Sequence, residues 1–451
     1  MGAEVAAIPV STAPAEGLRR QLGLGSAAAA VAGEAIGVGI FLTPAAMAKS
    51  LGSPFWLLVV WLGMGAMTMS GALCFGELAG RFPRPGGSYV YLQETFGPRV
   101  AFLYGWMCLL VLDPGLTAAL AAGIASYAAY IFHWSPITIK LAALSCIWML
   151  CLLNVVSTRM SAGFLRSMTW LKFGVLILLT VWAIVFHRGD WANFVPFVAR
   201  REGSLPLGPA LGGGVVAAFF SFGGWWDLSK IAGEVRDPAR TVPRAMVLGV
   251  LAVTAAYVLI STVFVYLIPL NRVTSDETFV AQAGEVLFGS AGGVLLAAIV
   301  IVCVLGSMAA LIMSAPRVYF AMAQDGLFLP AVARISPRFG TPALAVAILG
   351  VVSSVLVLLG TFQQIIAYFV FAAVIFLGLT VAGLLVVRAR REAPGVALLT
   401  PGYPFTPIVF LGLVVLLLAL LMAHGPLQPL LGCAVVFLGV PVYSAFRRRP
   451  A

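Results

Sequence analysis

The segment Gly33-Glu34-Ala35-Ile36-Gly37-Val38-Gly39-Ile40-Phe41 places three glycines within seven residues, beside a carboxylate, in an otherwise apolar stretch. A second segment, Phe219-Phe220-Ser221-Phe222-Gly223-Gly224-Trp225-Trp226-Asp227, combines glycines and an acid in the same way. A helix in lipid satisfies its own backbone hydrogen bonds, so an interruption is tolerated only where it lines a cavity or packs in protein. If these segments lie in a membrane, both predict a broken helix.

The composition shows that the surrounding solvent is lipid. Of the 451 residues, 61% are hydrophobic and only 10% are Asp, Glu, Lys or Arg. Soluble domains have about 45–50% apolar and about 25% charged residues. So little charge cannot cover a water-facing surface. The sequence therefore predicts an all-α membrane protein that crosses the bilayer many times.

A membrane-spanning helix needs about 20 predominantly apolar residues, and the sequence predicts twelve. They are 22–49, 54–79, 100–132, 137–158, 168–186, 209–235, 242–268, 291–322, 342–360, 363–387, 404–423 and 427–446. The two glycine-containing segments fall in spans one and six. These positions correspond if spans 1–5 and 6–10 are two repeats, and an odd number of helices per repeat inverts the second.

This reading divides the chain into five parts. They are a cytoplasmic tail (1–21), a first five-helix repeat (22–186), a second, inverted repeat (209–387), two additional helices (404–446) and a basic cytoplasmic tail (447–451). Between the repeats, 187–208 is expected to form an external loop. Within the second repeat, 269–290 is expected to contain a short amphipathic helix on the outer surface.

The basic residues predict the orientation. Twenty lie on the side of the membrane that holds both termini and six on the other, while Lys172 alone lies well inside a span. Cytoplasmic loops are enriched in Lys and Arg, so both termini are expected in the cytoplasm. The expected location is the inner (cytoplasmic) membrane of the cell. Orientation accounts for the net charge of +11, and nucleic-acid binding, which needs a basic soluble face, is excluded.

Enzyme, metal and cofactor chemistry find no support in the sequence. The six cysteines lie in apolar stretches, the three histidines lack ligand spacing, and no phosphate-binding loop or nucleophile motif occurs. We expect neither a metal nor a cofactor.

Breaks of this kind suit a zwitterionic ligand. Free N–H groups at a half-helix N-terminus bind a carboxylate, and free carbonyls at a facing C-terminus accept hydrogen bonds from an ammonium group. An α-amino acid fits this description without any charged side chain. The alternative, that the glycines only allow close helix packing, is weakened because the two segments occupy corresponding positions and each lies beside an acid.

Five stretches resemble the amino acid–polyamine–organocation superfamily, most closely its L-type amino acid transporter-like bacterial members. They are GEAIGVGIFLTP (33–44), FGELAGRFPRPGGSYVYLQETFGP (75–98), SFGGWWDLSKIAGEVRDPARTVPRA (221–245), GSMAALIMSAPRVYFAMAQDGLFLP (306–330) and PGYPFTP (401–407). The resemblance implies the leucine-transporter-type fold, a five-plus-five inverted repeat followed by two helices.

The resemblance also implies a set of substrate-binding residues. The amides of Gly37, Val38 and Gly39 would bind the substrate carboxylate. Carbonyls at Ala35 and Ile36, and in the second break at Phe220, Ser221, Phe222 and Gly223, would bind the amino group. Phe220 stands where the family has an aromatic gate, and Val38 stands where Ser or Ala is commoner.

Lys172 lies in span five, where a charge costs at least about 2.5–3.5 kcal/mol. The resemblance places it where sodium-coupled relatives bind an ion, bridging the first broken helix to Ser307 in span eight. We hypothesise that its ammonium group replaces sodium. The alternatives are that Lys172 reaches to the membrane interface, or that it carries a proton.

Three acids also lie within spans. Asp113, Glu34 and Asp227 either select a cationic substrate, carry a proton or pair internally. Asp227 and Lys230, at spacing three, and Glu77 and Arg81, at spacing four, are expected to form local pairs.

Together these patterns predict a sodium-independent secondary active transporter, a permease or exchanger, that moves amino acids by alternating access. The alternative substrates are cationic amino acids or polyamines, and a channel or sensor would use the same pocket without coupled transport. Mammalian L-type relatives form a disulfide to a partner subunit in the loop between spans three and four. Here that loop, 133–136, has no cysteine, so the expected partners are the amino acid and the lipid bilayer, without a covalent heavy chain.

Overall fold

The structure is a computed structural model that describes residues 22–37, 39–84, 86–156, 162–270, 279–336, 341–390 and 399–447. Within these ranges the fold is all-helical, and its single β-bridge joins Leu22 to Val235. That bridge brings the chain entering the first helix against the chain leaving the second glycine-containing segment.

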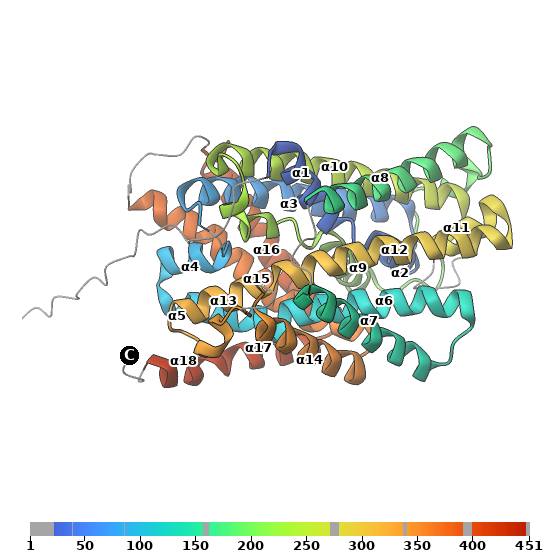
Figure 1. The fold of residues 1–451 in the computed structure, drawn as a ribbon. Coiled ribbons are helices and arrows are strands. Elements are labelled where there is room, and N and C mark those ends of the chain that lie inside the picture. Colours follow the sequence, from blue (N-terminus) through green and yellow to red (C-terminus); the bar gives the residue numbers. More distant parts are fainter. Residues whose placement is uncertain are drawn as a thin grey trace, which may run out of the picture.

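Helices account for most of the described residues (Figure 1). The α-helices are α1 (Leu24–Ala35), α2 (Gly39–Leu51), α3 (Pro54–Arg81), α4 (Ser88–Phe96), α5 (Pro98–Met107), α6 (Asp113–Phe132), α7 (Pro136–Val156), α8 (Ala162–Val185), α9 (Leu207–Phe222), α10 (Pro238–Leu267), α11 (Phe279–Phe288), α12 (Ser290–Ser314), α13 (Pro316–Gln324), α14 (Ala343–Leu359), α15 (Phe362–Ala389), α16 (Phe405–His424), α17 (Leu427–Phe437) and α18 (Gly439–Arg447). Shorter helical turns are η1 (Cys108–Leu112), η2 (Trp191–Phe194), η3 (Asp227–Ser229), η4 (Ala232–Glu234) and η6 (Pro330–Ala333).

Nine helical segments of the described chain are long and apolar enough to cross a membrane. They are Pro54–Arg81, Pro98–Phe132, Pro136–Val156, Leu207–Ser229, Pro238–Leu267, Ser290–Gln324, Gln364–Ala389, Phe405–Ala423 and Pro429–Phe446. Two shorter apolar helices, Thr169–Val185 and Ala343–Leu359, coincide with predicted spans five and nine. The protein is therefore a multi-pass membrane protein, as its composition predicts.

Both predicted helix breaks are confirmed. The first span is two helices, because α1 ends at Ala35 and α2 begins at Gly39. The sixth span is α-helical only to Phe222 and continues as the 3₁₀ turns η3 and η4. The expected span 209–235 is thus not one continuous helix, since its second half has no regular α-helix.

The third span contains a feature that the sequence reading did not predict. The five residues of η1 form a π-helical turn between α5 and α6, and Asp113 follows it directly. Pro114 has no N–H to donate to the preceding turn, and its ring crowds the carbonyl there. A π-turn relieves such a conflict and is often found at functional sites.

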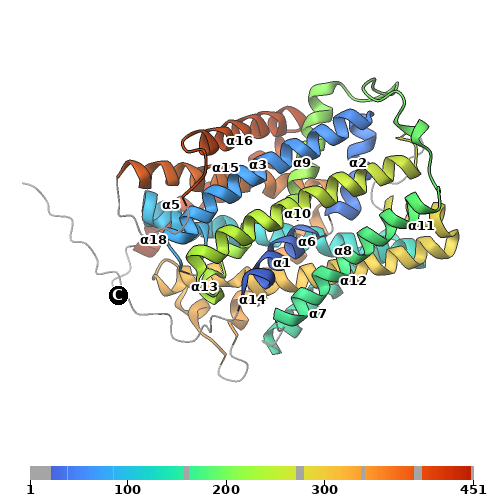
Figure 2. The same cartoon turned by 90° about the horizontal axis from the view of Figure 1, so that it is seen from above.

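The helices run along one common direction, and the two breaks meet in the middle of the bundle. In both views α11 and α18 lie at opposite ends of the molecule (Figures 1 and 2). The helix α2 packs against α9, α1 and α3 pack against α10, and α6 packs against α12. The breaks therefore face α6, α10 and α12, which supply part of the site.

The two segments outside the predicted spans contain little regular structure. The external loop expected at 187–208 contains only the short turn η2 before α9 begins. A short helix, α11, follows within the expected region 269–290, of which residues 271–278 lie outside the described part.

Candidate functional site

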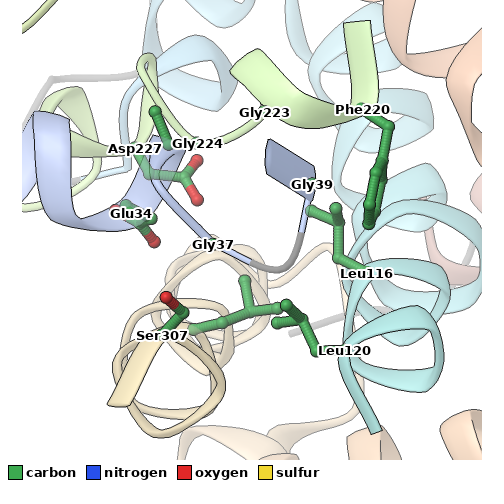
Figure 3. A pocket seen from close by; sticks show the side chains of 12 residues that line it. Glu34, Gly37, Gly39, Leu116, Leu120, Phe220, Gly223, Gly224, Asp227 and Ser307 are labelled. Carbon is green, nitrogen blue, oxygen red and sulfur yellow. The ribbon is translucent and has the colours of Figure 1, made fainter. Parts of the chain in front are cut away.

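A small cavity of about 30 Å³ lies between the two breaks (Figure 3). Its walls are Glu34, Ala35, Gly37, Gly39, Leu116, Leu120, Phe220, Gly223, Gly224, Asp227, Ser307 and Leu311. A cavity of this size has room for water but not for an amino acid. Loading a larger ligand therefore requires the surrounding segments to move apart.

The start of α2 is fixed directly onto α9. A Cβ atom on Gly39 would collide with the backbone of Ser221, so only glycine allows this approach. The hydroxyls of Thr43 and Ser221 then form a hydrogen bond of 2.7 Å between the two helices. The first N–H groups of a helix have no partner within it, and this packing places the start of α2 at the cavity, which Gly39 lines.

Tyr257 joins the carbonyl ends of both broken helices. Its hydroxyl lies 2.6 Å from the carbonyl oxygen of Ala35 and 2.6 Å from that of Ser221. The one hydroxyl proton is shared between two helices that are far apart in sequence. The sequence reading missed this residue, although a tyrosine inside an apolar span needs a partner for its hydroxyl.

Lys172 also binds the carbonyl end of α1. Its ammonium group donates to the carbonyl of Gly33 at 2.6 Å and to the hydroxyl of Ser307 at 2.5 Å. The side chain is 2% exposed, so it does not reach to the membrane interface. These contacts are the ones that the sequence predicts, whereas replacement of sodium stays a prediction.

Behind the cavity, the expected pair of Asp227 and Lys230 is present and includes a third member. The ammonium group of Lys230 lies 2.8 Å from Asp227 Oδ1 and 3.5 Å from Asp113 Oδ1. Tyr319 donates to the other oxygen of Asp113 at 2.8 Å. Asp113 is thus paired internally and does not line the cavity, whereas Asp227 does both.

Glu34 is the acid with the least compensation. It lines the cavity with Asp227, and its Oε1 atom is buried without a hydrogen-bond donor among the described residues. Gly224 packs against its side chain with φ of +96°, a conformation that favours glycine. The close approach of Gly224 holds the Glu34 side chain beside the second break.

The predicted ligand-binding residues divide into two groups. Ala35, Gly37, Gly39, Phe220, Gly223, Glu34, Asp227 and Ser307 line the cavity. Ile36, Ser221 and Phe222 are buried next to it, and the ring of Phe222 instead packs on Trp61 and Tyr257. Val38 lies outside the described residues.

Three leucines of the cavity, Leu116, Leu120 and Leu311, were not predicted. They come from α6 and α12, whose sequences resemble any other apolar span. Only the packing of α6 on α12 identifies the faces that meet the breaks. Among the described residues, no three His, Cys, Asp or Glu side chains are placed to hold a metal ion.

Residues 22–438 match the family described as "Amino acid permease". The chain belongs to this family. The serine/threonine exchanger SteT of Bacillus subtilis is 30% identical over 96% of this chain and 98% of its own. The b(0,+)-type amino acid transporter 1 of Mus musculus is 27% identical over 91% of this chain and 83% of its own.

A third relative is the cystine/glutamate transporter of Homo sapiens, 27% identical over 95% of this chain and 85% of its own. The matches cover almost all of the permease, including both breaks. The permease is thus an amino acid transporter and not an enzyme. The predicted resemblance to amino acid transporters is confirmed.

Proposed function

We propose that this permease is a secondary carrier that moves amino acids across the membrane by alternating access. The observation that carries the proposal is the pair of broken helices facing each other across one cavity. Unwound segments at the middle of spanning helices are the typical substrate sites of transporters with inverted repeats.

In this proposal the substrate backbone binds to the protein backbone. The segment from Gly37 to Gly39, which leads into α2, offers amides to the carboxylate, aided by the positive end of the helix dipole. The Gly37 N–H donates to the carbonyl of Ala35 at 2.7 Å in this structure, so the substrate carboxylate replaces that acceptor. The carbonyls around Ala35, Ile36, Phe220 and Ser221 accept hydrogen bonds from the ammonium group. In this structure the Tyr257 hydroxyl occupies two of these carbonyls, those of Ala35 and Ser221. Substrate entry therefore competes with the Tyr257 hydroxyl.

The movement follows from the proposed architecture of twelve spans. Residues 22–186 and 209–387 form the two inverted repeats, 404–446 add two helices, and 1–21 and 447–451 are tails. The breaks in spans one and six support this division, because they occupy corresponding places in the two repeats. Rocking of the five-plus-five core around the breaks opens the cavity to one side at a time.

Lys172 makes the carrier independent of sodium. Its ammonium group already supplies a positive charge to Gly33 and Ser307, where an ion would otherwise join α1 to α12. We expect uptake by proteoliposomes to be equal in sodium and choline chloride at constant ionic strength, and steep dependence on sodium would disprove this role.

Replacing the charge tests the same role from the protein side. Lys172→Met should lower amino acid binding about ten- to hundredfold, because hydrogen bonds to charged groups contribute roughly 1.5–3 kcal/mol. Lys140→Met is the matched control, since Lys140 also donates to a carbonyl, that of Leu358, but at an exposed site. Equal binding by the two variants would contradict the proposal.

The proposed setting is the inner (cytoplasmic) membrane with both termini in the cytoplasm. The excess of basic residues on that side supports this orientation. The loop at 133–136 lacks a cysteine, which supports function without a covalent heavy chain. Expression of the chain alone followed by reconstitution tests this point.

Counterflow in proteoliposomes tests the central proposal. A carrier loaded with unlabelled serine or leucine should accumulate labelled amino acid faster than empty vesicles do. A channel or a sensor would show no acceleration by internal substrate. Either of those results, with protein shown to be inserted, would overturn the assignment as a carrier.

A second candidate substrate class is the cationic amino acids or polyamines. The position of Glu34 and Asp227 on the cavity wall favours it, while the internal pairing of Asp113 removes that residue from direct contact. A panel of amino acids and amines scored by thermal shift tests this candidate, because ligand binding stabilises the folded protein.

A further inference from the structure

The charges around the cavity do not balance. Three carboxyl groups, those of Glu34, Asp113 and Asp227, face two ammonium groups, those of Lys172 and Lys230. If all five were ionised, one negative charge would remain uncompensated within the membrane. Such a charge is costly, because removal from water is not repaid by a partner.

The hydrogen bonds show which of the three carboxyl groups lack a compensating partner. Asp113 pairs with the ammonium group of Lys230 and accepts a hydrogen bond from the hydroxyl of Tyr319, so both of its carboxylate oxygens have partners. Lys230 is divided between Asp113 and Asp227. Glu34 Oε1 and Asp227 Oδ2 are both buried and lack a donor among the residues that the structure describes.

Glu34 and Asp227 lie on the same wall of the cavity (Figure 3), and both have buried carboxyl oxygens without a donor among the described residues. Two ionised carboxylates have only acceptor atoms. A hydrogen bond between them therefore requires a proton on one of them, as in other sites where two carboxyl groups meet. One such proton also removes the excess negative charge.

We propose that Glu34 and Asp227 share one proton in the empty carrier, and that the cationic side chain of a basic amino acid replaces it. A neutral amino acid leaves the proton bound. During the replacement, the carboxyl O–H of the pair ionises and its proton passes to water. The ammonium group of the substrate then donates its own N–H groups to both carboxylates. This inference rests on the proposed function, since it assumes that the amino acid occupies this cavity.

The residues that line the cavity suit a side chain with an apolar stem and a cationic end. Leu116, Leu120 and Phe220 lie on the wall opposite the two acids (Figure 3). An aliphatic stem packed on these residues points its terminal group to Glu34 and Asp227. A neutral side chain finds the same apolar wall while the shared proton keeps the acidic wall uncharged.

Several other titratable groups surround the pair. Lys172 from α8 and Lys230 beside η3 face Glu34. Asp113 from α6, Tyr104 from α5 and Cys108 from η1 are the other titratable groups near Asp227.

Isothermal titration calorimetry of the purified full-length protein measures the proton directly. Lysine and leucine are titrated at one pH in phosphate and in Tris, which differ in heat of ionisation. The difference in observed heat should show about one proton released per bound lysine and none per bound leucine. Raising the pH by one unit should tighten lysine binding by up to about tenfold and leave leucine binding unchanged.

Variants locate the proton. Glu34→Gln should weaken lysine binding at least roughly 30-fold more than it weakens leucine binding, and it should abolish proton release. Glu34→Asp keeps a carboxyl group and should retain part of the release. Glu285→Gln, which removes an acid bonded to Tyr130 outside the cavity, should behave as the unchanged protein.

Each outcome decides between the two proposals. Binding of both amino acids without proton release, or binding of leucine without lysine, overturns the shared proton but not the carrier. Release that persists in Glu34→Gln also overturns it. If neither amino acid binds and counterflow is absent as well, the proposed function fails, and the inference fails with it.

Discussion

The site requires glycine at position 39, where the side chain is a single hydrogen atom. Its Cα approaches the backbone of Ser221 so closely that no side chain fits between α2 and α9. Rotation of a side chain cannot relieve the clash, because the obstructing atoms include backbone. Glycine is therefore required at position 39 for the close packing of α2 on α9, in addition to its effect in interrupting the helix.

Gly39→Ala should reduce counterflow to less than about a tenth of the unchanged protein, because a strained contact of roughly 1–3 kcal/mol shifts α2 and its amides. Gly63→Ala on α3 is the matched control. A Cβ at Gly63 meets no atom within 4 Å, so transport should be retained. Normal counterflow by Gly39→Ala would show that the contact between α2 and α9 does not determine the site.

At the scale of elements, Tyr257 connects the two broken helices through one hydroxyl. The ring also packs on Phe222 with centroids 5.0 Å apart and on Trp61 at the same distance. Removing only the oxygen therefore leaves the packing of α10 intact. The substitution therefore tests the hydrogen bonds of Tyr257 without changing its apolar contacts.

Tyr257→Phe should weaken amino acid binding about five- to tenfold, since a hydrogen bond contributes roughly 0.5–1.5 kcal/mol. The physical reason is that the carbonyl ends of α1 and α9 lose their common donor and are held less firmly. A thermal-shift titration with leucine measures the change. Tyr368→Phe, which removes a longer hydroxyl contact to Leu110, should bind leucine normally, and an equal loss in both would contradict this role.

The sequence predicted those elements whose signal is local. Runs of about 20 apolar residues define the spans, and clustered glycines beside Glu34 and Asp227 locate both breaks. The π-turn before Asp113 and the 3₁₀ turns after Phe222 were not predicted. Their conformations result from Pro114 and from packing around Lys230, which joins segments more than 100 residues apart.

The family resemblance implied the residues of the two breaks, and other residues of the site were predicted only where they are unusual in an apolar helix. Lys172 and the acids stand out in lipid, so each was recognised from its charge alone. Leu116, Leu120 and Tyr257 are ordinary residues of apolar helices, and their roles depend on which helix face meets the breaks. The pairing of Asp113 with Lys230 and Tyr319 depends on tertiary contacts in the same way.

At the scale of the whole molecule, Glu77 joins three parts of the chain at the end of α3. Its carboxylate binds Arg81 at 2.8 Å, Arg388 of α15 at 2.5 Å and the backbone N–H of Thr400 at 2.7 Å. The sequence predicted the first contact alone. Arg388 also lies 4.0 Å from the ring centroid of Tyr403, so the cluster ties the tenth predicted span to the chain that enters α16.

Glu77→Gln should lower the free energy of unfolding by roughly 3 kcal/mol, because two guanidinium groups lose a buried carboxylate. The effect stays at the low end of the range for such pairs, since Arg81 and Arg388 are 11% and 18% exposed. Unfolding by sodium dodecyl sulfate in mixed micelles measures it. Glu94→Gln breaks an exposed pair with Arg84 and should change stability by less than about 1 kcal/mol.

Because the Glu77 cluster lies outside the cavity, Glu77→Gln should retain leucine binding at temperatures where it is folded. A selective loss of binding there would instead make this end of the bundle part of the transport mechanism.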